Sequence, residues 1–200
     1  MPTTHLLYLH GFRSSPRSAK AQQMAAAVAA LRQAGRDVHW ACPQLPPSPA
    51  QAWADIQRLT ADWPRDTMAV MGSSLGGFYA TVLAEQSGCT AVLINPAVAP
   101  ARDLARYIGE QTAFHDPQAS FFFKPEFIDE FKAIEPYPIT RPERYLALIA
   151  KGDEVLDWRE MVGHYPGAQL TLLEGGDHAL TDFDPHLPGV LAFLGLSRRP

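Results

Sequence analysis

The residue types best suited to catalysis lie together in the segment Val70–Ala80, which contains three glycines and two serines. Residues 72–76 read Gly-Ser-Ser-Leu-Gly and match G-x-S-x-G, the pattern of a serine on a tight turn between a strand and a helix. Glycine is needed two positions before and after the serine, because the turn presses those positions against each other and against neighbouring strands. The pattern predicts a nucleophile at Ser74. The alternative is a glycine-rich turn without chemistry; a phosphate-binding loop would need a Gly-Lys-Ser/Thr ending or G-x-G-x-x-G, and the segment has neither.

A serine hydroxyl becomes a nucleophile only when a base removes its proton and a third group orients that base. Two later segments contain such partners: Asp153 directly follows an apolar run, and His178 follows the next apolar run behind two glycines. The order serine, acid, histidine is typical of hydrolases with this kind of turn. We therefore predict a triad of Ser74, Asp153 and His178. Asp153 could instead cap the helix that follows it, and Asp157 is the alternative acid.

The oxyanion formed during acyl transfer needs two backbone N–H groups that are fixed in advance. One is expected from Leu75, which follows the nucleophile. The other is expected from Phe12, in the loop after the first apolar run, where Gly11 lets the backbone turn toward the site. His10 is interpreted as a residue that shapes this loop, and it is also a candidate for the substrate pocket.

Alternating apolar runs and helical patterns predict the elements that position these residues. Short apolar runs predict strands at residues 5–10, 37–43, 66–72, 89–96, 144–153 and 168–178. Apolar residues at helical spacing, with capping residues and terminal glycines, predict helices at residues 14–35, 50–63, 75–88, 156–165 and 184–196. The alternation predicts an α/β fold, a three-layer sandwich with a mostly parallel sheet of about six strands. Function in such sheets gathers at the carboxyl ends of the strands.

The alternation is interrupted at residues 98–142, a segment rich in proline and aromatic residues that shows no clear strand. We expect a single domain, residues 1–200, that carries this segment as an inserted cap. Phe121, Phe122 and Phe123 give the cap an apolar surface and predict an acyl pocket. A small satellite core that holds the insertion together is the alternative.

Three cations lie at the start of the first predicted helix, where they oppose the helix dipole. They are Arg13, Arg17 and Lys20, and no acidic residue is near them in the sequence. We hypothesise that an anionic group of the substrate, such as the phosphates of a coenzyme A thioester, docks there; the alternative is a solvated face. Arg13 is accordingly a candidate residue of the substrate pocket.

Composition excludes several classes of partner. Lys and Arg number 17 against 21 Asp and Glu, giving a net charge of -4, so the chain has no basic field that would bind nucleic acid. No apolar run approaches the roughly 20 residues that span a bilayer, and the N-terminus lacks the pattern of a signal peptide, so we expect a cytoplasmic protein. Cys42 and Cys89 lie in apolar surroundings and are expected to be reduced core residues, with neither a disulfide nor a metal site.

Several motifs together resemble the small bacterial α/β-hydrolase esterases of the YqiA type, over almost the full chain. They are YLHGFRSSPRSAKA, PQLPP, GSSLGGFYAT, INPAV, GDEVLDWR and EGGDHALTDF. The resemblance implies a compact α/β hydrolase that lacks the first strands of larger relatives, an esterase of acyl esters or thioesters, with Ser74, Asp153 and His178 as nucleophile, acid and base. We expect no cofactor. The resemblance is weakest at about residues 102–137. A non-catalytic hydrolase-fold binding protein, or a lyase or carbon-carbon hydrolase with the same triad, is the alternative, and the oligomeric state is not predicted.

Overall fold

The apolar residues of the chain divide between two hydrophobic clusters on opposite faces of a central sheet. In the first strand, Leu7 and Leu9 contribute to one cluster, whereas Leu6 and Tyr8 contribute to the other. Successive side chains of a strand point to opposite faces, so a strand covered on both faces is apolar at nearly every position. The computed structural model describes residues 2–197 and shows how this sheet is built.

The sheet has six parallel strands in the order β2-β1-β3-β4-β7-β8. The strands are β1 (His5–Leu9), β2 (His39–Ala41), β3 (Met68–Ser73), β4 (Thr90–Ile94), β7 (Tyr145–Ala150) and β8 (Gln169–Leu173). The register pairs Leu9 with Gly72 and Ser73 with Ile94, so the carboxyl ends of β1, β3 and β4 form one edge. The prediction of a mostly parallel sheet of about six strands is confirmed.

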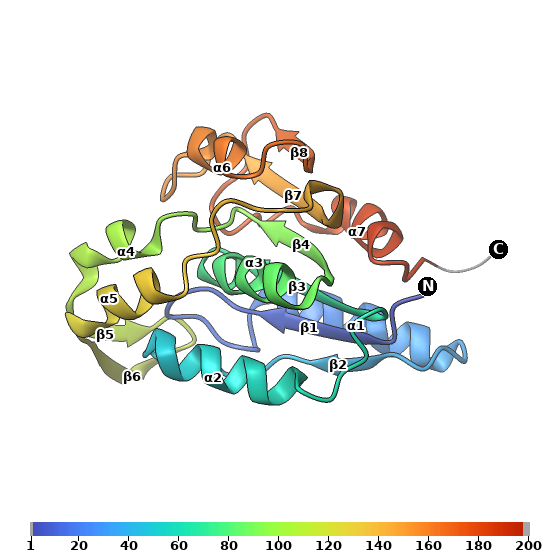
Figure 1. The fold of residues 1–200 in the computed structure, drawn as a ribbon, viewed down its shortest axis with the longest axis horizontal. Helices are drawn as coiled ribbons and strands as arrows, with labels where there is room; N and C mark the ends of the chain where they lie inside the picture. The colour runs from blue at the N-terminus through green and yellow to red at the C-terminus, as the bar shows by residue number, and fades with distance from the viewer. Residues whose placement is uncertain (1, 198–200) are drawn as a thin grey trace.

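Helices cover both faces of this sheet and complete three layers (Figure 1). The helices of the two outer layers are α1 (Ala19–Gln33), α2 (Pro49–Thr60), α3 (Leu75–Ser87), α6 (Trp158–His164) and α7 (Leu187–Phe193). α2, α3 and α6 pack on one face, and α1 and α7 pack on the other. Helix α1 begins later than its sequence predicts, because Ser18 has an extended backbone and forms its N-cap. Single 3₁₀ turns occur at Ala105–Tyr107, Pro142–Arg144 and Asp184–His186.

The segment of residues 98–142, which we call the insertion, contains more regular structure than its sequence predicts. α4 (Pro100–Asp103) and α5 (Glu126–Ala133) flank a hairpin of two antiparallel strands, β5 (Gly109–Ala113) and β6 (Asp116–Phe123). The prediction that this segment shows no clear strand is wrong. The hairpin forms a small sheet of its own, so its strands do not need the continuous apolar run that marks the buried strands of the main sheet. Figure 1 shows the insertion on the left, at the end toward which β1 points.

The two cysteines are free thiols. Burial raises the pKa of Cys42 to about 12 and the pKa of Cys89 to about 11. Both therefore stay protonated near neutral pH, which makes them poor alternatives to a serine nucleophile. Within residues 2–197, no helix is both long enough and apolar enough to cross a bilayer.

Candidate active site

Ser74 lies between the end of β3 and the start of α3 in a strained backbone conformation. Its φ and ψ angles are 55° and -123°, outside the regions that residues other than glycine usually adopt. The Ser74 N–H donates to the carbonyl of Ile94 at 2.9 Å, so the end of β4 holds the turn in place. This conformation lifts the serine side chain out of the end of the sheet.

Three glycines make room for this turn. A Cβ atom at Gly72 would lie 2.1 Å from the carbonyl oxygen of Gly76, and a Cβ atom at Gly76 would lie 1.9 Å from that of Leu9. A Cβ atom at Gly77 would lie 2.7 Å from the Cβ of Pro96. Any larger residue at Gly72 would collide with the backbone of α3, and any larger residue at Gly76 would collide with the backbone of β1. Neither backbone can move without displacing the element to which it belongs. The glycine spacing in the sequence therefore has a direct steric cause.

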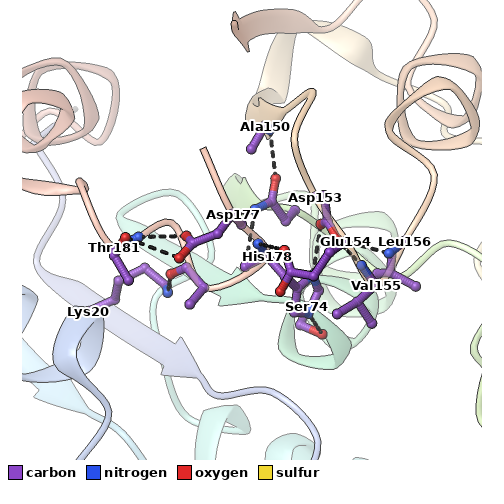
Figure 2. A network of polar contacts seen from close by, with 12 residues as sticks. Lys20, Ser74, Ala150, Asp153, Glu154, Val155, Leu156, Asp177, His178 and Thr181 are labelled. Atoms are coloured by element: carbon purple, nitrogen blue, oxygen red, sulfur yellow. Dashed lines mark hydrogen bonds and ion pairs between the residues drawn. The ribbon is translucent and has the colours of Figure 1, made fainter. Parts of the chain in front are cut away.

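The three residues of the predicted triad lie in one hydrogen-bonded line (Figure 2). His178 Nε2 is 2.9 Å from Ser74 Oγ, and His178 Nδ1 is 2.7 Å from Asp153 Oδ2. A carboxylate only accepts hydrogen bonds, so Nδ1 carries the ring proton and Nε2 accepts from the serine hydroxyl. In this arrangement His178 Nε2 can accept the proton of the Ser74 hydroxyl when Ser74 Oγ attacks a substrate.

Asp153 is well suited to hold the histidine ring. Its side chain is 0% exposed, and its Oδ1 accepts from the backbone N–H groups of Val155 and Leu156 at 2.8 and 2.9 Å. Both carboxylate oxygens therefore have fixed partners. Asp157, the alternative acid, instead is the N-cap of α6, where its Oδ1 accepts from the N–H of Arg159 at 2.9 Å.

Asn95 connects the ends of the strands that carry the acid and the base, a role that sequence reasoning missed. Its side chain is fully buried, and its Nδ2 donates to the carbonyls of Asp177 and His178 at 3.0 and 3.1 Å. Its Oδ1 accepts from the N–H of Ala150 at 2.8 Å. Asn95 also has a positive φ of 41°, which asparagine tolerates better than most residues. The sequence signal is the asparagine directly after a buried strand, in the motif INPAV.

Two further side chains hold the loop around His178. Glu154 Oε2 accepts from the N–H of His178 at 2.9 Å, and Lys20 Nζ donates to the carbonyl of Ala179. Hydrogen bonds from Thr181 lower the pKa of the Asp177 carboxyl, and Lys20 adds to this effect. The loop is thus fixed at both sides of the histidine by contacts between distant parts of the chain.

The two predicted oxyanion donors lie close to the nucleophile. Leu75 is the first residue of α3, so its N–H has no acceptor within the helix. Phe12 follows Gly11, at which a Cβ atom would lie 3.2 Å from the Cβ of Ser74. Within residues 2–197, the N–H of Phe12 donates to no backbone carbonyl. Both N–H groups are therefore available to an oxyanion near Ser74.

His10 is part of the scaffold of this loop. It is 3% exposed; its Nδ1 lies 2.9 Å from the carbonyl of Gly11, and its Nε2 accepts from the N–H of Leu45 at 3.0 Å. Burial lowers the pKa of His10, which keeps the ring neutral and able to accept. The side chain is thus committed to the loop, and among residues 2–197 it is not part of the cavity wall described next.

Ser74 and His178 open into a cavity of about 390 Å³. The insertion supplies one wall, with Leu104, Tyr107 and Phe114. A cavity of this size suits a small ligand.

The three consecutive phenylalanines of β6 do not form this wall, contrary to the sequence-based expectation. Among residues 2–197, the lining includes none of them. Phe123 is fully buried and Phe121 is partly buried, and both rings pack edge-on against Phe12, at 5.3 and 5.8 Å between centroids. Phe122 points to the other face of the hairpin and is 58% exposed. Phe121 and Phe123 therefore hold the insertion on the loop of Phe12, and Phe123 belongs to the hydrophobic cluster of the main sheet and α3 rather than to a separate satellite core.

The three predicted cations do not converge on one anion site. Lys20 is committed to Ala179, and Arg17 is exposed and lies outside the cavity wall. Arg13 does line the cavity, but its Nε donates to the carbonyl of Thr112 at 2.6 Å and its guanidinium stacks on Phe114 at 4.3 Å. Arg13 thus also links the loop after β1 to the hairpin of the insertion.

Comparison with known proteins supports the fold and identifies the family. A family model described as "Uncharacterised protein family (UPF0227)" matches residues 5–195. The chain is similar to the solved structure of alpha/beta hydrolase domain-containing protein 10 from mouse, with 18% identity, coverage of 92% of this chain and 85% of that chain, and a TM-score of 0.67. A structure from work on LipS and LipT, two metagenome-derived lipolytic enzymes, is 20% identical over 96% and 94% of the two chains, with a TM-score of 0.70. Est1E from Butyrivibrio proteoclasticus with bound ferulic acid is 16% identical over 96% and 87%, with a TM-score of 0.67.

Proposed function

Because the chain belongs to the uncharacterised protein family UPF0227 and has the α/β-hydrolase fold, we propose that it is a serine hydrolase of carboxylic esters or acyl thioesters. The observation that carries the proposal is the line of hydrogen bonds from Asp153 through His178 to Ser74, with lengths of 2.7 and 2.9 Å. Similar structures from lipolytic enzymes and from Est1E, which holds ferulic acid, support the substrate class.

In the proposed mechanism, Ser74 Oγ attacks the carbonyl carbon of the substrate while His178 Nε2 accepts the hydroxyl proton. The negative charge on the carbonyl oxygen is stabilised by the N–H groups of Phe12 and Leu75. The carbon–oxygen or carbon–sulfur bond to the leaving group then breaks, and His178 returns the proton to the leaving group. Asp153 holds the ring and stabilises its cationic form.

The second half of the reaction repeats these steps with water. His178 removes a proton from a water molecule, whose oxygen attacks the acyl carbon, and the bond to Ser74 Oγ breaks as the serine regains a proton. The products are a carboxylic acid and an alcohol or thiol. All groups that take part in these steps are side chains, backbone amides and water. The insertion serves as a cap over the site and contributes Leu104, Tyr107 and Phe114 to the wall of the cavity in which the substrate binds.

Ester hydrolysis by purified protein tests the proposal. We expect turnover of chromogenic acyl esters of graded chain length, and we expect Ser74→Ala to lower kcat by about 10⁴-fold or more while the protein stays folded. Ser120→Ala is the matched control, because Ser120 is an exposed serine of β6, and its kcat is expected to equal that of the unchanged protein. Full turnover in Ser74→Ala, or no turnover of any ester or thioester by the unchanged protein, contradicts the proposal.

A further inference from the structure

The loop after β1 makes a tight turn at residues 11–14, and this turn carries the N–H of Phe12 that we propose as an oxyanion donor. The N–H of Ser14 donates to the carbonyl of Gly11 at 3.2 Å, which closes the turn. Phe12 and Arg13 are thus its two central residues. Arg13 has a φ of 59°, a left-handed conformation that at this position of a turn favours glycine or asparagine. Because arginine does not favour this conformation by itself, other contacts must keep the turn in shape.

Arg13 receives these contacts from the hairpin of the insertion. Its carbonyl accepts from the N–H of Phe114 at 2.8 Å, and its Nε donates to the carbonyl of Thr112 at 2.6 Å. Its guanidinium lies over the ring of Phe114, at 4.3 Å from the centroid. The main chain and the side chain of Arg13 are therefore both bound to the segment that joins β5 to β6. Backbone strain persists where surrounding contacts determine the conformation, and these three contacts do so at Arg13.

The other central residue of the turn also contacts the insertion. The ring of Phe12 lies 5.6 Å from that of Tyr107, 5.8 Å from that of Phe121 and 5.3 Å from that of Phe123, measured between centroids. Phe123 is fully buried in the hydrophobic cluster of the main sheet. Both side chains at the centre of the turn are thus packed against the insertion.

Contacts with the insertion can position the turn because the insertion is itself joined to the main scaffold. Glu130 of α5 accepts, at its Oε2, from Ser48 Oγ at 2.7 Å and from the N–H of Ala50 at 2.9 Å, at the start of α2. Phe131 is 1% exposed and packs edge-on against Phe78 of α3, at 5.7 Å between centroids. The insertion therefore connects the turn of the oxyanion donor with the helix that begins directly after the nucleophile.

We propose that Arg13 is a positioning residue of the oxyanion hole. Its contacts with Thr112 and Phe114 hold the turn of residues 11–14 in its strained shape and so keep the N–H of Phe12 directed at the oxyanion. An oxyanion donor is effective only when it is fixed in advance, and loss of one donor lowers kcat by about 10²–10³-fold. The insertion then contributes to the chemical step as well as to the cavity wall. This inference rests on the proposed ester hydrolase and adds a residue to its machinery.

The variant Arg13→Met removes the donor and the guanidinium but keeps an unbranched side chain. The left-handed backbone then loses two of its three supports, so the turn relaxes in part of the molecules. We expect kcat for p-nitrophenyl butyrate to fall by about tenfold, from the cost of a left-handed arginine or methionine. KM should stay within about twofold, because the lost interaction acts in the transition state. Arg17→Met is the matched control, since it makes the same change of charge at an exposed position, and its kcat is expected to equal that of the unchanged protein.

The variant Arg13→Gly separates the shape of the turn from the charge of the side chain. Glycine adopts a φ of about 59° without strain, so the turn keeps its shape without the contacts of the guanidinium. We expect Arg13→Gly to retain at least about a third of the kcat of the unchanged protein, and so to exceed Arg13→Met. Equal kcat values in the two variants overturn the inference. A higher KM for p-nitrophenyl hemisuccinate in both variants, with an unchanged kcat for the butyrate, also overturns it, because Arg13 would then bind the carboxylate of the substrate.

Inhibition by butylboronic acid reads the oxyanion hole directly. Its boron forms a tetrahedral adduct with Ser74 Oγ, in which one oxygen takes the position of the oxyanion. The inhibition constant should rise in Arg13→Met by the same factor by which kcat falls. A lower urea midpoint with unchanged kcat and inhibition constant would show a role in stability alone and overturns the inference.

The same assays separate this inference from the hydrolase proposal. Ester turnover by the unchanged protein with an equal kcat in Arg13→Met overturns the role of Arg13 and leaves the hydrolase proposal standing. No turnover of any ester or thioester by the unchanged protein contradicts the hydrolase proposal and, with it, the role of Arg13.

Discussion

The substitution Asn95→Asp tests whether the base is held in place by the amide that joins three strand ends. The variant keeps the size of the side chain, and its carboxyl can still accept from the N–H of Ala150. Aspartate also tolerates the positive φ of 41° at this position. What changes is the Nδ2 group, which donates to the carbonyls of Asp177 and His178.

The expected cost follows from these contacts. Two donated hydrogen bonds contribute about 1 kcal/mol each, and a buried carboxyl group that faces two carbonyls adds about 1–3 kcal/mol, because Asn95 is fully buried. We therefore expect the free energy of unfolding to fall by about 3–5 kcal/mol. Since the two carbonyls belong to the loop of His178, the ring should also shift, and a displacement of about 1 Å at a catalytic group lowers kcat by about 100-fold.

Urea unfolding and ester hydrolysis measure the two effects separately. Glu154→Gln is the matched control, because its side-chain oxygen can still accept from the N–H of His178 at an exposed position. Its kcat is expected to stay within about threefold of the unchanged protein. If Asn95→Asp unfolds at the same urea concentration as the unchanged protein and keeps full kcat, the amide does not position the histidine.

Three further predictions concern the acid, the turn and the pH dependence of stability. Asp153→Asn should lower kcat by about 10⁴-fold, whereas Asp157→Asn should leave kcat unchanged, because of these two carboxylates only that of Asp153 contacts the ring of His178. Equal kcat values for the two variants in ester hydrolysis would refute this assignment. Gly76→Ala should lower the free energy of unfolding by more than about 3 kcal/mol, because the new Cβ would lie 1.9 Å from a backbone oxygen. Gly163→Ala in α6, where a Cβ meets nothing within 4 Å, should raise it by about 0.5–1 kcal/mol, and urea unfolding of both proteins checks the contrast. Burial lowers the pKa of His10 below 6.5, so around and below that pH the unfolded chain binds more protons than the folded protein. The contribution of the neutral ring to the free energy of unfolding is therefore complete above pH 6.5. It decreases as the pH falls below 6.5, by up to about 1.4 kcal/mol per pH unit. Equal urea midpoints at about pH 7.5 and about pH 5.5 would contradict it.

The sequence predicts the main sheet well because its strands are buried on both faces. Continuous apolar runs such as residues 145–150 leave little choice of structure, and the glycines of residues 72–77 indicate a tight turn through sterics alone. The hairpin of the insertion was not predictable in the same way. Its strands are half exposed and pair only with each other, so β5 reads Gly-Glu-Gln-Thr-Ala, a sequence without a buried-strand pattern.

The parts of the site that sequence could not predict depend on contacts between distant residues. Ser74, Asp153 and His178 follow strands in a known order, which made them candidates from the sequence. By contrast, Asn95 contacts residues 82 and 83 positions later in the chain, and Lys20 contacts one 159 positions later. No local pattern carries such information, so the supports of the histidine loop emerge only from the folded structure.

The side chains that line the cavity were also not predictable from local sequence patterns. The composition of the insertion indicates an apolar pocket, but the alternation of side chains in β6 turns Phe122 outward and Phe121 and Phe123 toward Phe12. Aromatic residues elsewhere in the insertion, including Tyr107, line the cavity instead. Which aromatic side chain faces the substrate depends on strand register, which the sequence of the hairpin does not specify.

Reaction with a fluorophosphonate, followed by mass mapping of the peptides, tests the activation of Ser74 by His178 most directly. The reagent modifies a serine only when a base increases its nucleophilicity. We predict one modified peptide, carrying the adduct on Ser74, and loss of this adduct in a folded His178→Ala protein. An unmodified Ser74 in the unchanged protein, or equal labelling in both proteins, would show that the hydrogen bond between these side chains does not create a nucleophile.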